Sequence, residues 1–398
     1  MIHARVNVNG LACSGLVLCL GGAVGCAHEV SGGTSAASGQ HVIAAPLTEP
    51  GATMGAASSS TSDLAQEENW SQPTKDVVAF LGRVQADADG SALWAWSGSG
   101  FRVRFTGTGL QARFVDHDNF HSVSVDGQAP RSIEMRAGQV IYALASGLPL
   151  GEHTVEVRRR TEALFGVTHL LGLRVEAGRL LSAPPSKARS IEIVGDSISC
   201  GYGNEGSGPA CPFSAATENH DRSYGRLLAD ELDAELSTVA WSGRGVVKNY
   251  AGEPGELMPT LYERVLPQVA ASSWAFTRSA DVVIVNLGTN DFSTEPDPEF
   301  SQFRDAYAAL LAKIRARNPL AFVVCTLGPM LPPVDLQRAV RAIQAAIQLR
   351  TVEGDQRVSY FPLGVSNDAP GCDWHPSVAT HERMAKALMP VVRRLTGW

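Results

Sequence analysis

Two hydrophobic patterns divide the chain beyond its first 75 residues. Between residues 76 and 183, short segments alternate apolar and polar side chains, as in Phe101-Arg102-Val103-Arg104-Phe105. A period of two is typical of half-buried strands, and turn signals such as Asp126-Gly127 separate the segments. Roughly eight short strands at this spacing predict a β-sandwich of the jelly-roll type. The expected strands cover residues 77–83, 93–96, 101–106, 110–115, 121–125, 139–146, 153–159 and 168–176.

The pattern changes after Pro184-Pro185, which marks a domain boundary. In residues 186–398, short apolar runs such as Ile191–Val194 alternate with segments long enough to form helices. Such spacing needs crossover connections, which are typical of a parallel sheet with helices on both faces. We therefore predict a three-layer α/β domain of the flavodoxin type. The expected strands are 191–194, 235–241, 282–287, 321–326 and 358–361, and the helices fall near 223–233, 258–275, 300–317, 335–350 and 378–395.

The first 26 residues have the pattern of a signal peptide. Arg5 precedes an apolar run from Leu11 to Gly25 that is too short for a transmembrane helix. The small residues Ala23-Val24-Gly25 before Cys26 suggest a bacterial lipoprotein signal, with Cys26 as the lipidated residue; an ordinary secretory signal is the alternative. Residues 27–75 are rich in Ser, Gly, Ala and Pro and predict a flexible linker. We expect an exported protein, in the cell envelope or secreted, which meets a membrane only through this anchor.

Charge and cysteine content limit the choice of partners. The net charge of −7 and the lack of a basic cluster beyond Arg158–Arg160 argue against a nucleic-acid partner. No cysteine pair has zinc-site spacing, and the Asp116-His117-Asp118-Asn119 segment suits a hairpin turn better than a metal site. We expect neither a metal nor a cofactor, and a monomer.

Four further cysteines can form disulfides in an exported protein. A Cys200–Cys211 bridge would close the loop after Ser197, and a Cys325–Cys372 bridge would tether a strand end to the final loop. The sequence leaves the pairing open.

Polar residues follow successive strands of the predicted parallel sheet. Ser197 ends the first strand within Gly195-Asp196-Ser197, Gly243 follows the second, and Asn290 follows the third. His375 lies in the loop before the last helix. Because the carboxyl ends of parallel strands meet at one edge, we expect these residues to share a crevice.

This set of residues suits ester hydrolysis. The Ser197 hydroxyl becomes a nucleophile when a base such as His375 takes its proton. A tetrahedral intermediate then needs donors aimed at its oxyanion. The backbone N–H groups of Ser197 and Gly243 and the side-chain amide of Asn290 are the candidates.

The order of these motifs resembles that of the SGNH (GDSL-type) hydrolases. The four matching segments are Gly195-Asp196-Ser197, Gly243, Gly288-Thr289-Asn290-Asp291 and Asp373-Trp374-His375-Pro376. Together with the preceding sandwich, the motifs in residues 195–203 and 241–250, Ala95–Gly100 and Arg160-Thr161-Glu162 resemble carbohydrate esterase family 2. The resemblance implies a jelly roll followed by an SGNH domain, and the removal of O-acetyl groups from polysaccharides such as xylan and glucomannan.

The third catalytic residue departs from the SGNH pattern. The orienting aspartate usually lies three residues before the histidine, but Cys372 occupies that place and Asp373 lies two before. Two alternatives remain: Asp373 completes a triad, or Ser197 and His375 act as a dyad helped by backbone carbonyls, as the resemblance allows.

Other polar and aromatic residues are candidates for substrate contact or for packing. We expect substrate contacts from Tyr202, Trp241, Arg244 and Trp374. His220 and His381 are expected at the surface or in packing. Trp94 and Trp96 are expected to fill the sandwich core or the contact between the domains.

The sequence thus predicts an exported serine esterase that removes acetyl groups from carbohydrate through an acetyl-serine intermediate. One alternative keeps the chemistry but acts on lipid, aryl or peptidoglycan O-acetyl esters. The other is a carbohydrate-binding lipoprotein without catalysis.

Overall fold

The computed structural model of the chain describes residues 70–398. The predicted signal peptide 1–26 with Cys26, and the predicted linker up to residue 69, lie outside the described residues. The described chain pairs with the sandwich earlier than the predicted boundary at 76, because Ser71 forms an antiparallel bridge with Leu173.

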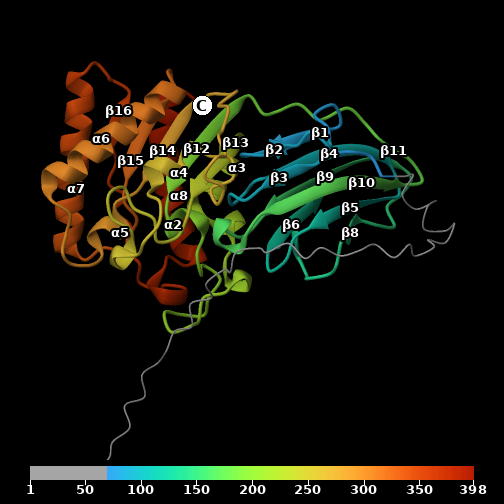
Figure 1. Cartoon of the computed structure of the whole chain (residues 1–398), viewed down its shortest axis with the longest axis horizontal. Coiled ribbons are helices and arrows are strands. Elements are labelled where there is room, and N and C mark those ends of the chain that lie inside the picture. Colours follow the sequence, from blue (N-terminus) through green and yellow to red (C-terminus); the bar gives the residue numbers. More distant parts are fainter. Residues whose placement is uncertain (1–69) are drawn as a thin grey trace, which may run out of the picture. The chain divides into compact units, whose positions relative to one another are not determined.

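The first domain is a sandwich of two antiparallel sheets, as predicted (Figure 1). On β4, the side chains of Phe101, Val103 and Phe105 are buried, while Arg102 and Arg104 between them are not. The alternation read from the sequence therefore marks the inner face. One sheet has the order β1-β4-β9-β6-β7, with β11 beside β4, and comprises Val78–Leu81, Gly100–Gly107, Gly151–Arg159, Phe120–Val125, Arg131–Glu134 and Arg179–Leu180. The other has the order β2-β3-β10-β5-β8 and comprises Gln85–Ala86, Ala92–Trp94, Thr168–Glu176, Gly109–Val115 and Ile141–Ala145.

The second domain contains a parallel sheet with the strand order β13-β12-β14-β15-β16, the order of flavodoxin-like folds (Figure 1). Its strands are β12 (Arg189–Gly195), β13 (Ala234–Ala240), β14 (Val282–Asn286), β15 (Phe322–Thr326) and β16 (Val358–Tyr360). Its helices are α2 (Ser197–Cys200), α3 (Tyr224–Glu231), α4 (Met258–Leu261), α5 (Thr289–Phe292), α6 (Phe300–Arg317), α7 (Pro333–Val352) and α8 (Val378–Thr396). None of the helices in residues 70–398 is long and apolar enough to cross a bilayer.

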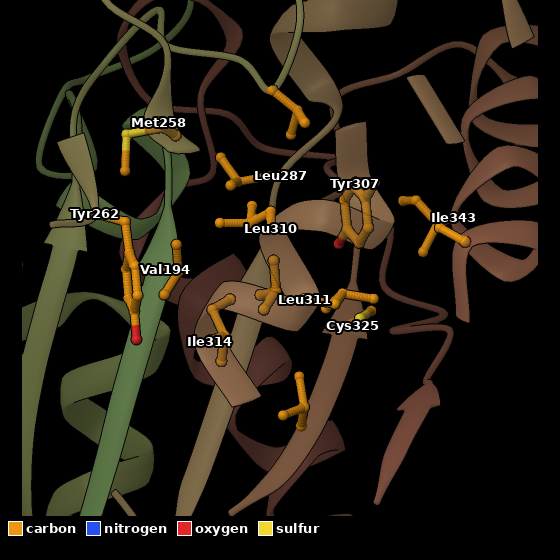
Figure 2. Packing of buried hydrophobic residues seen from close by; sticks show 14 of the residues in the cluster. Val194, Met258, Tyr262, Leu287, Tyr307, Leu310, Leu311, Ile314, Cys325 and Ile343 are labelled. Atoms are coloured by element: carbon orange, nitrogen blue, oxygen red, sulfur yellow. The ribbon is translucent and has the colours of Figure 1, made fainter. Parts of the chain in front are cut away.

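Helices cover both faces of the parallel sheet. On β12, Ile191 and Ile193 pack into a cluster with residues of α3 and α8, such as Leu228 and Leu388. Val194 points to the other face, where residues of α6 and α7 complete the core (Figure 2). The uninterrupted apolar sequence of β12 thus reflects burial on both faces.

The helix predicted over residues 258–275 is wrong beyond α4. The backbone carbonyls of this segment are used by donors from the sandwich: Trp96 Nε1 and Arg83 both donate to the Arg264 carbonyl, at 3.2 and 3.0 Å. Val265 and Leu266 pack against Ala95 of the sandwich rather than along one helical face. Pro267, whose nitrogen has no hydrogen to donate, further disfavours a continued helix.

A buried ion pair joins the two domains. The Arg83 guanidinium, fully buried, donates to Glu192 of β12 at 3.0 Å. Tyr262 donates to the other oxygen of the same carboxylate at 2.9 Å. The Arg83 guanidinium also lies 4.9 Å from the ring centre of Phe276. Both charges are therefore compensated inside the domain interface.

We predict that Arg83→Ala lowers the free energy of unfolding by about 3–5 kcal/mol, because it leaves the Glu192 carboxylate buried without its cation. Urea denaturation followed by tryptophan fluorescence measures this loss. The matched control is Arg104→Gln, which breaks the exposed pair with Glu152 and should cost about 1 kcal/mol or less. Equal losses for the two variants would contradict the prediction.

Candidate active site

Ser197 lies where β12 ends and α2 begins. The Asp196 carboxylate caps α2 by accepting the Ile198 N–H at 3.1 Å. A Cβ at Gly195 would lie 2.1 Å from Ser199 Oγ, so this turn requires glycine. The side chain of Ser197 is thereby held at the carboxyl end of the sheet, with 7% of the residue exposed.

His375 meets Ser197 as predicted. Its Nε2 atom lies 2.8 Å from Ser197 Oγ, although the two residues are 178 positions apart. The Tyr202 ring packs on the imidazole with 4.1 Å between ring centres. Phe213 stacks on the opposite face of Tyr202 at 3.6 Å. The imidazole is therefore fixed by a hydrogen bond at its edge and by an aromatic ring on its face.

The second nitrogen of the imidazole binds a main-chain carbonyl. His375 Nδ1 lies 3.1 Å from the carbonyl oxygen of Asp373. Of the two alternatives that the sequence left open, this contact fits a Ser197–His375 dyad helped by a backbone carbonyl. The Asp373 carboxylate, the candidate for the triad acid, instead accepts the Tyr202 hydroxyl at 2.8 Å. The reason is local: Asp373 and Trp374 have φ angles of 48° and 64°, a turn that presents the carbonyl to the ring. This carbonyl fixes the tautomer in which Nδ1 carries the proton.

A disulfide supports the histidine loop, but with a pairing that neither sequence alternative gave. The structure joins Cys211 to Cys372, whose Cα atoms lie 4.9 Å apart. Cys200 and Cys325 are free and buried, so neither of the two suggested pairings forms. The Cys372 N–H also donates to the Gly203 carbonyl at 3.0 Å. The disulfide and this bond tie the loop that follows Ser197 to the loop that carries His375.

The predicted oxyanion donors lie on neighbouring strand ends. The sheet register places Gly195 of β12 beside Ala240 of β13 and Asn286 of β14, so the loops that follow begin side by side. The Asn290 amide donates to the Arg244 carbonyl at 2.9 Å, which leaves a second N–H on the amide.

Two main-chain donors complete this candidate oxyanion site. Within residues 70–398, the backbone N–H groups of Ser197 and Gly243 have no hydrogen-bond partner. Gly243 has a φ of 77°, a conformation that favours glycine. Unpaired N–H groups at these positions are available to a developing oxyanion.

Asp291 supports the site, although its motif, Gly288-Thr289-Asn290-Asp291, predicted no role for it. Its carboxylate, fully buried, accepts the N–H groups of Val246, Val247 and Lys248 at 2.8–3.1 Å. These residues follow Gly243 in the same loop. Burial raises the pKa of Asp291, and the three N–H groups oppose that rise. Its place directly after Asn290 was the available signal.

Two groups of residues are close enough to share a cation. Glu162, Cys200 and Glu218 are buried together, but the Glu162 carboxylate already accepts the Ser242 N–H at 2.7 Å. The buried guanidinium of Arg159 also supplies positive charge to Glu162 and Glu218. The second group lies near the surface, where Arg338 binds all of its members: Glu295, Asp297 and Asp335. Each group thus has a cationic partner within the described chain.

The four residues predicted to contact substrate differ in where the structure places them. Tyr202 supports His375, as described above. Trp374 is 67% exposed directly beside His375. Arg244 lies over the Trp241 ring at 5.1 Å, and Trp241 itself packs partly against the core. Tyr250, which was not predicted, is 52% exposed, and its N–H donates to the Gly243 carbonyl at 2.9 Å.

Of the two places expected for His220 and His381, the surface or the packed interior, the structure shows the interior. His220 is buried and pairs with Thr238 Oγ1 at 2.9 Å, and His381 Nδ1 accepts the Tyr224 N–H at 3.2 Å. Trp94 lies in the sandwich core, and Trp96 joins the core of the second domain. In the segment 116–119, Asn119 donates to the Asp116 carboxylate at 2.5 Å and thereby closes a turn between β5 and β6.

Comparisons with known proteins identify the class of each domain. Residues 193–383 match the model of the GDSL-like Lipase/Acylhydrolase family, which agrees with the SGNH architecture of the second domain. Residues 80–185 match the model described as Carbohydrate esterase 2 N-terminal.

Solved structures and curated relatives support the same family. A family two carbohydrate esterase from Clostridium thermocellum, solved in complex with cellohexaose, is 34% identical with a TM-score of 0.76, and covers 81% of this chain and 99% of that one. The chain therefore belongs to carbohydrate esterase family 2. A family two esterase from Cellvibrio japonicus is 27% identical, with a TM-score of 0.74 over 81% of this chain and 96% of that one.

Two curated relatives carry names that describe their own activities. The Cellulase/esterase CelE of Acetivibrio thermocellus is 35% identical over 81% of this chain, and the alignment spans only 40% of that longer protein. The Acetylxylan esterase / glucomannan deacetylase of Cellvibrio japonicus is 28% identical over 81% of this chain and 89% of its own length.

The position of the Asp373 carboxylate leads to a prediction about the catalytic residues. We expect Asp373→Asn to keep kcat on an aryl acetate within about threefold of the unmodified protein, because the main-chain carbonyl at Nδ1 is unchanged. An aspartate whose carboxylate binds the histidine loses about 10⁴-fold on the same change. Steady-state kinetics decide between the two, and a loss above about 10³-fold would restore the carboxylate as the histidine's partner. Tyr202→Phe is the control, since it removes the hydrogen bond that this carboxylate accepts from the Tyr202 hydroxyl.

Proposed function

We propose that this protein is a serine esterase that removes O-acetyl groups from hemicellulose, such as xylan or glucomannan. The observation that carries the proposal is the 2.8 Å contact between Ser197 Oγ and His375 Nε2 beside unpaired backbone N–H groups. Membership of carbohydrate esterase family 2 and the names of the relatives support the acetylated carbohydrate as substrate.

The first half of the proposed reaction forms an acetyl-serine. Ser197 Oγ attacks the acetyl carbonyl carbon while His375 Nε2 takes the hydroxyl proton. The oxyanion that forms is met by the N–H groups of Ser197 and Gly243 and by the Asn290 amide. The C–O bond to the sugar then breaks, and Nε2 returns the proton to the departing sugar oxygen.

The second half hydrolyses the acetyl-serine. Water attacks the same carbonyl carbon as His375 Nε2 takes its proton. The bond to Ser197 Oγ then breaks, acetate leaves, and the serine regains its hydrogen. Through both halves, the Asp373 carbonyl stabilises the imidazolium by accepting its Nδ1–H.

Exposed aromatic side chains support a carbohydrate substrate. Trp374 follows the Asp373 turn beside His375, and Tyr250 adjoins Gly243, so the two lie next to opposite parts of the catalytic machinery. Flat aromatic faces pack well against sugar rings because they bury apolar area at little conformational cost. Export with a lipid anchor at Cys26, and a monomeric state, remain predictions from the sequence.

Acetate release tests the substrate and the nucleophile together. We expect acetate release from acetylated xylan or glucomannan, and a loss of at least about 10³-fold in Ser197→Ala. Enzymatic acetate determination measures both. Unchanged release by Ser197→Ala would remove the serine mechanism. A clear preference for p-nitrophenyl octanoate over the acetate would contradict the acetyl specificity.

The pH dependence follows from the state of His375. Burial lowers the pKa of His375 to about 4 by disfavouring the imidazolium, while the carbonyls of Asp373 and Cys372 act in the opposite direction. The base is active when Nε2 is unprotonated, so activity is lost as pH falls through this pKa. We expect kcat/KM for an aryl acetate to be level between about pH 6 and 8 and to halve near pH 4. A midpoint near the ordinary histidine value, about 6.5, would contradict the burial argument.

A further inference from the structure

We propose that Glu162 of the sandwich domain is a positioning residue for the oxyanion site of the second domain. The inference rests on the proposed esterase function. Glu162 Oε2 accepts the backbone N–H of Ser242 at 2.7 Å, and Oε1 accepts the Ser242 hydroxyl. Ser242 directly precedes Gly243, whose N–H we assign to the oxyanion. One carboxylate from the first domain therefore binds both the backbone N–H and the side-chain hydroxyl of the residue before Gly243.

Glu162 also touches the loop of the nucleophile. Cys200, the last residue of α2, lies with Sγ 3.8 Å from Glu162 Oε2. The same helix begins with Ser197. The Glu162 carboxylate thus contacts both segments that supply main-chain donors to the candidate oxyanion site. It can therefore fix the position of the Gly243 N–H relative to the Ser197 N–H.

The backbone that carries this carboxylate is held by residues of both domains. Glu162 is fully buried, its N–H donates to Glu218 Oε2 at 3.1 Å, and its carbonyl accepts from Arg159 Nη2 at 2.8 Å. Arg159 is held in turn by the Thr161 carbonyl at 3.0 Å and by Thr168 Oγ1 at 3.0 Å. Because the Glu162 backbone is held in this way, its carboxylate fixes the position of Ser242 relative to the sandwich.

The electrostatic setting agrees with a costly and specific contact. Burial raises the pKa of Glu162, and the hydrogen bonds from Ser242 and Cys200 oppose that rise. Burial also raises the pKa of Glu218, with the negative charge of Glu162 adding to it. Two acids kept close together in the interior cost stability, and such perturbed groups are typical of functional sites.

The second side of the loop is held independently. The Gly243 carbonyl accepts the Tyr250 N–H at 2.9 Å, and Asp291 binds the N–H groups of residues 246–248. Asp291 therefore fixes the end of the loop that follows Gly243. Glu162 supports the side of the loop that precedes Gly243. Within residues 70–398, no carboxylate of the second domain binds Ser242.

The test compares Glu162→Ala and Glu162→Gln with the unmodified protein in hydrolysis of p-nitrophenyl acetate. A misplaced oxyanion donor weakens transition-state binding but not ground-state binding. We therefore expect Glu162→Ala to lower kcat by about 10–100-fold, less than outright removal of a donor costs, with KM changed by less than about threefold. Glu162→Gln can still accept the Ser242 N–H and should keep kcat within about fivefold.

A second measurement reads the oxyanion site directly. Phenylboronic acid forms a tetrahedral adduct with a reactive serine, in which one oxygen takes the place of the oxyanion. Its inhibition constant should rise in Glu162→Ala by about the factor by which kcat/KM falls. A purely structural role would lower the melting temperature without this proportionality.

The control breaks another contact between the same two domains. Arg102 of β4 pairs with Glu235 of β13 at 3.4 Å and does not touch the loops of Ser197, Gly243 or His375. Arg102→Gln should leave kcat unchanged. If Glu162→Ala does not fold, Ser242→Ala removes one of the two hydrogen bonds and should lower kcat by about 3–10-fold.

The outcomes separate the two hypotheses. The role of Glu162 is overturned if folded Glu162→Ala, or Ser242→Ala in its place, keeps the kcat of the unmodified protein, or if Arg102→Gln lowers kcat as much. An unmodified protein that hydrolyses neither p-nitrophenyl acetate nor acetylated glycans overturns the proposed function itself. An active protein with a fully active Glu162→Ala overturns only the role of Glu162.

Discussion

The candidate site depends on the hydrogen bond between Ser197 Oγ and His375 Nε2. The geometry of this bond has to be maintained by the loops that carry the two residues. Its partners are 178 positions apart and lie in separate loops. Hydrogen bonds weaken steeply as distance and angle depart from their optimum, so both loops must be fixed. The Cys211–Cys372 disulfide and the bond from the Cys372 N–H to the Gly203 carbonyl provide this restraint. These two contacts keep the loop after Ser197 and the loop of His375 together.

Buried carboxylates hold the remaining parts of the site. Asp196 caps the helix that begins with Ser197, Asp291 binds the loop after Gly243, and Glu162 binds the residue before Gly243. A carboxylate suits this task because it only accepts hydrogen bonds and can serve several N–H groups at once. The cost of this arrangement is desolvation of the carboxylates. Burial raises the pKa of Asp196 to about 7, and it also raises the pKa values of Asp291 and Glu162. Several buried acids near one serine are a departure from ordinary packing that function explains.

The sequence was sufficient for the fold and for the residues placed at strand ends. A change of hydrophobic period separates the sandwich from the parallel domain, and the order of Ser197, Gly243 and His375 along the chain predicts their meeting, since parallel strands share a carboxyl edge. The role of Asp373 could not be predicted, because it depends on two positive φ angles that decide whether a carbonyl or a carboxylate faces the imidazole. The disulfide was missed for a related reason: Cα separations follow from loop paths, which periodicity does not encode.

The segment 258–275 shows how the interface between the domains limits such predictions. Its apolar residues have a spacing compatible with a helix, yet Val265 and Leu266 face the sandwich, and the Arg264 carbonyl accepts bonds from it. Tertiary contacts with a second domain replaced the hydrogen bonds that a helix would have formed internally. Local propensity is a weak guide wherever another domain offers such donors.

The interface between the domains is built from buried polar contacts as well as apolar ones, and this choice has a mechanical consequence. Arg83 pairs with Glu192, and Arg158 of the sandwich pairs with Asp221 at 2.8 Å. Buried pairs add little net stability compared with apolar residues, but any displacement that separates the partners is strongly penalised. Apolar surfaces, in contrast, tolerate sliding, since burial is non-directional. An interface of paired charges therefore restricts the two domains to one relative position. The proposed role of Glu162 requires such a restriction, because the sandwich can position the oxyanion site through the Glu162–Ser242 bond only if the domains do not slide.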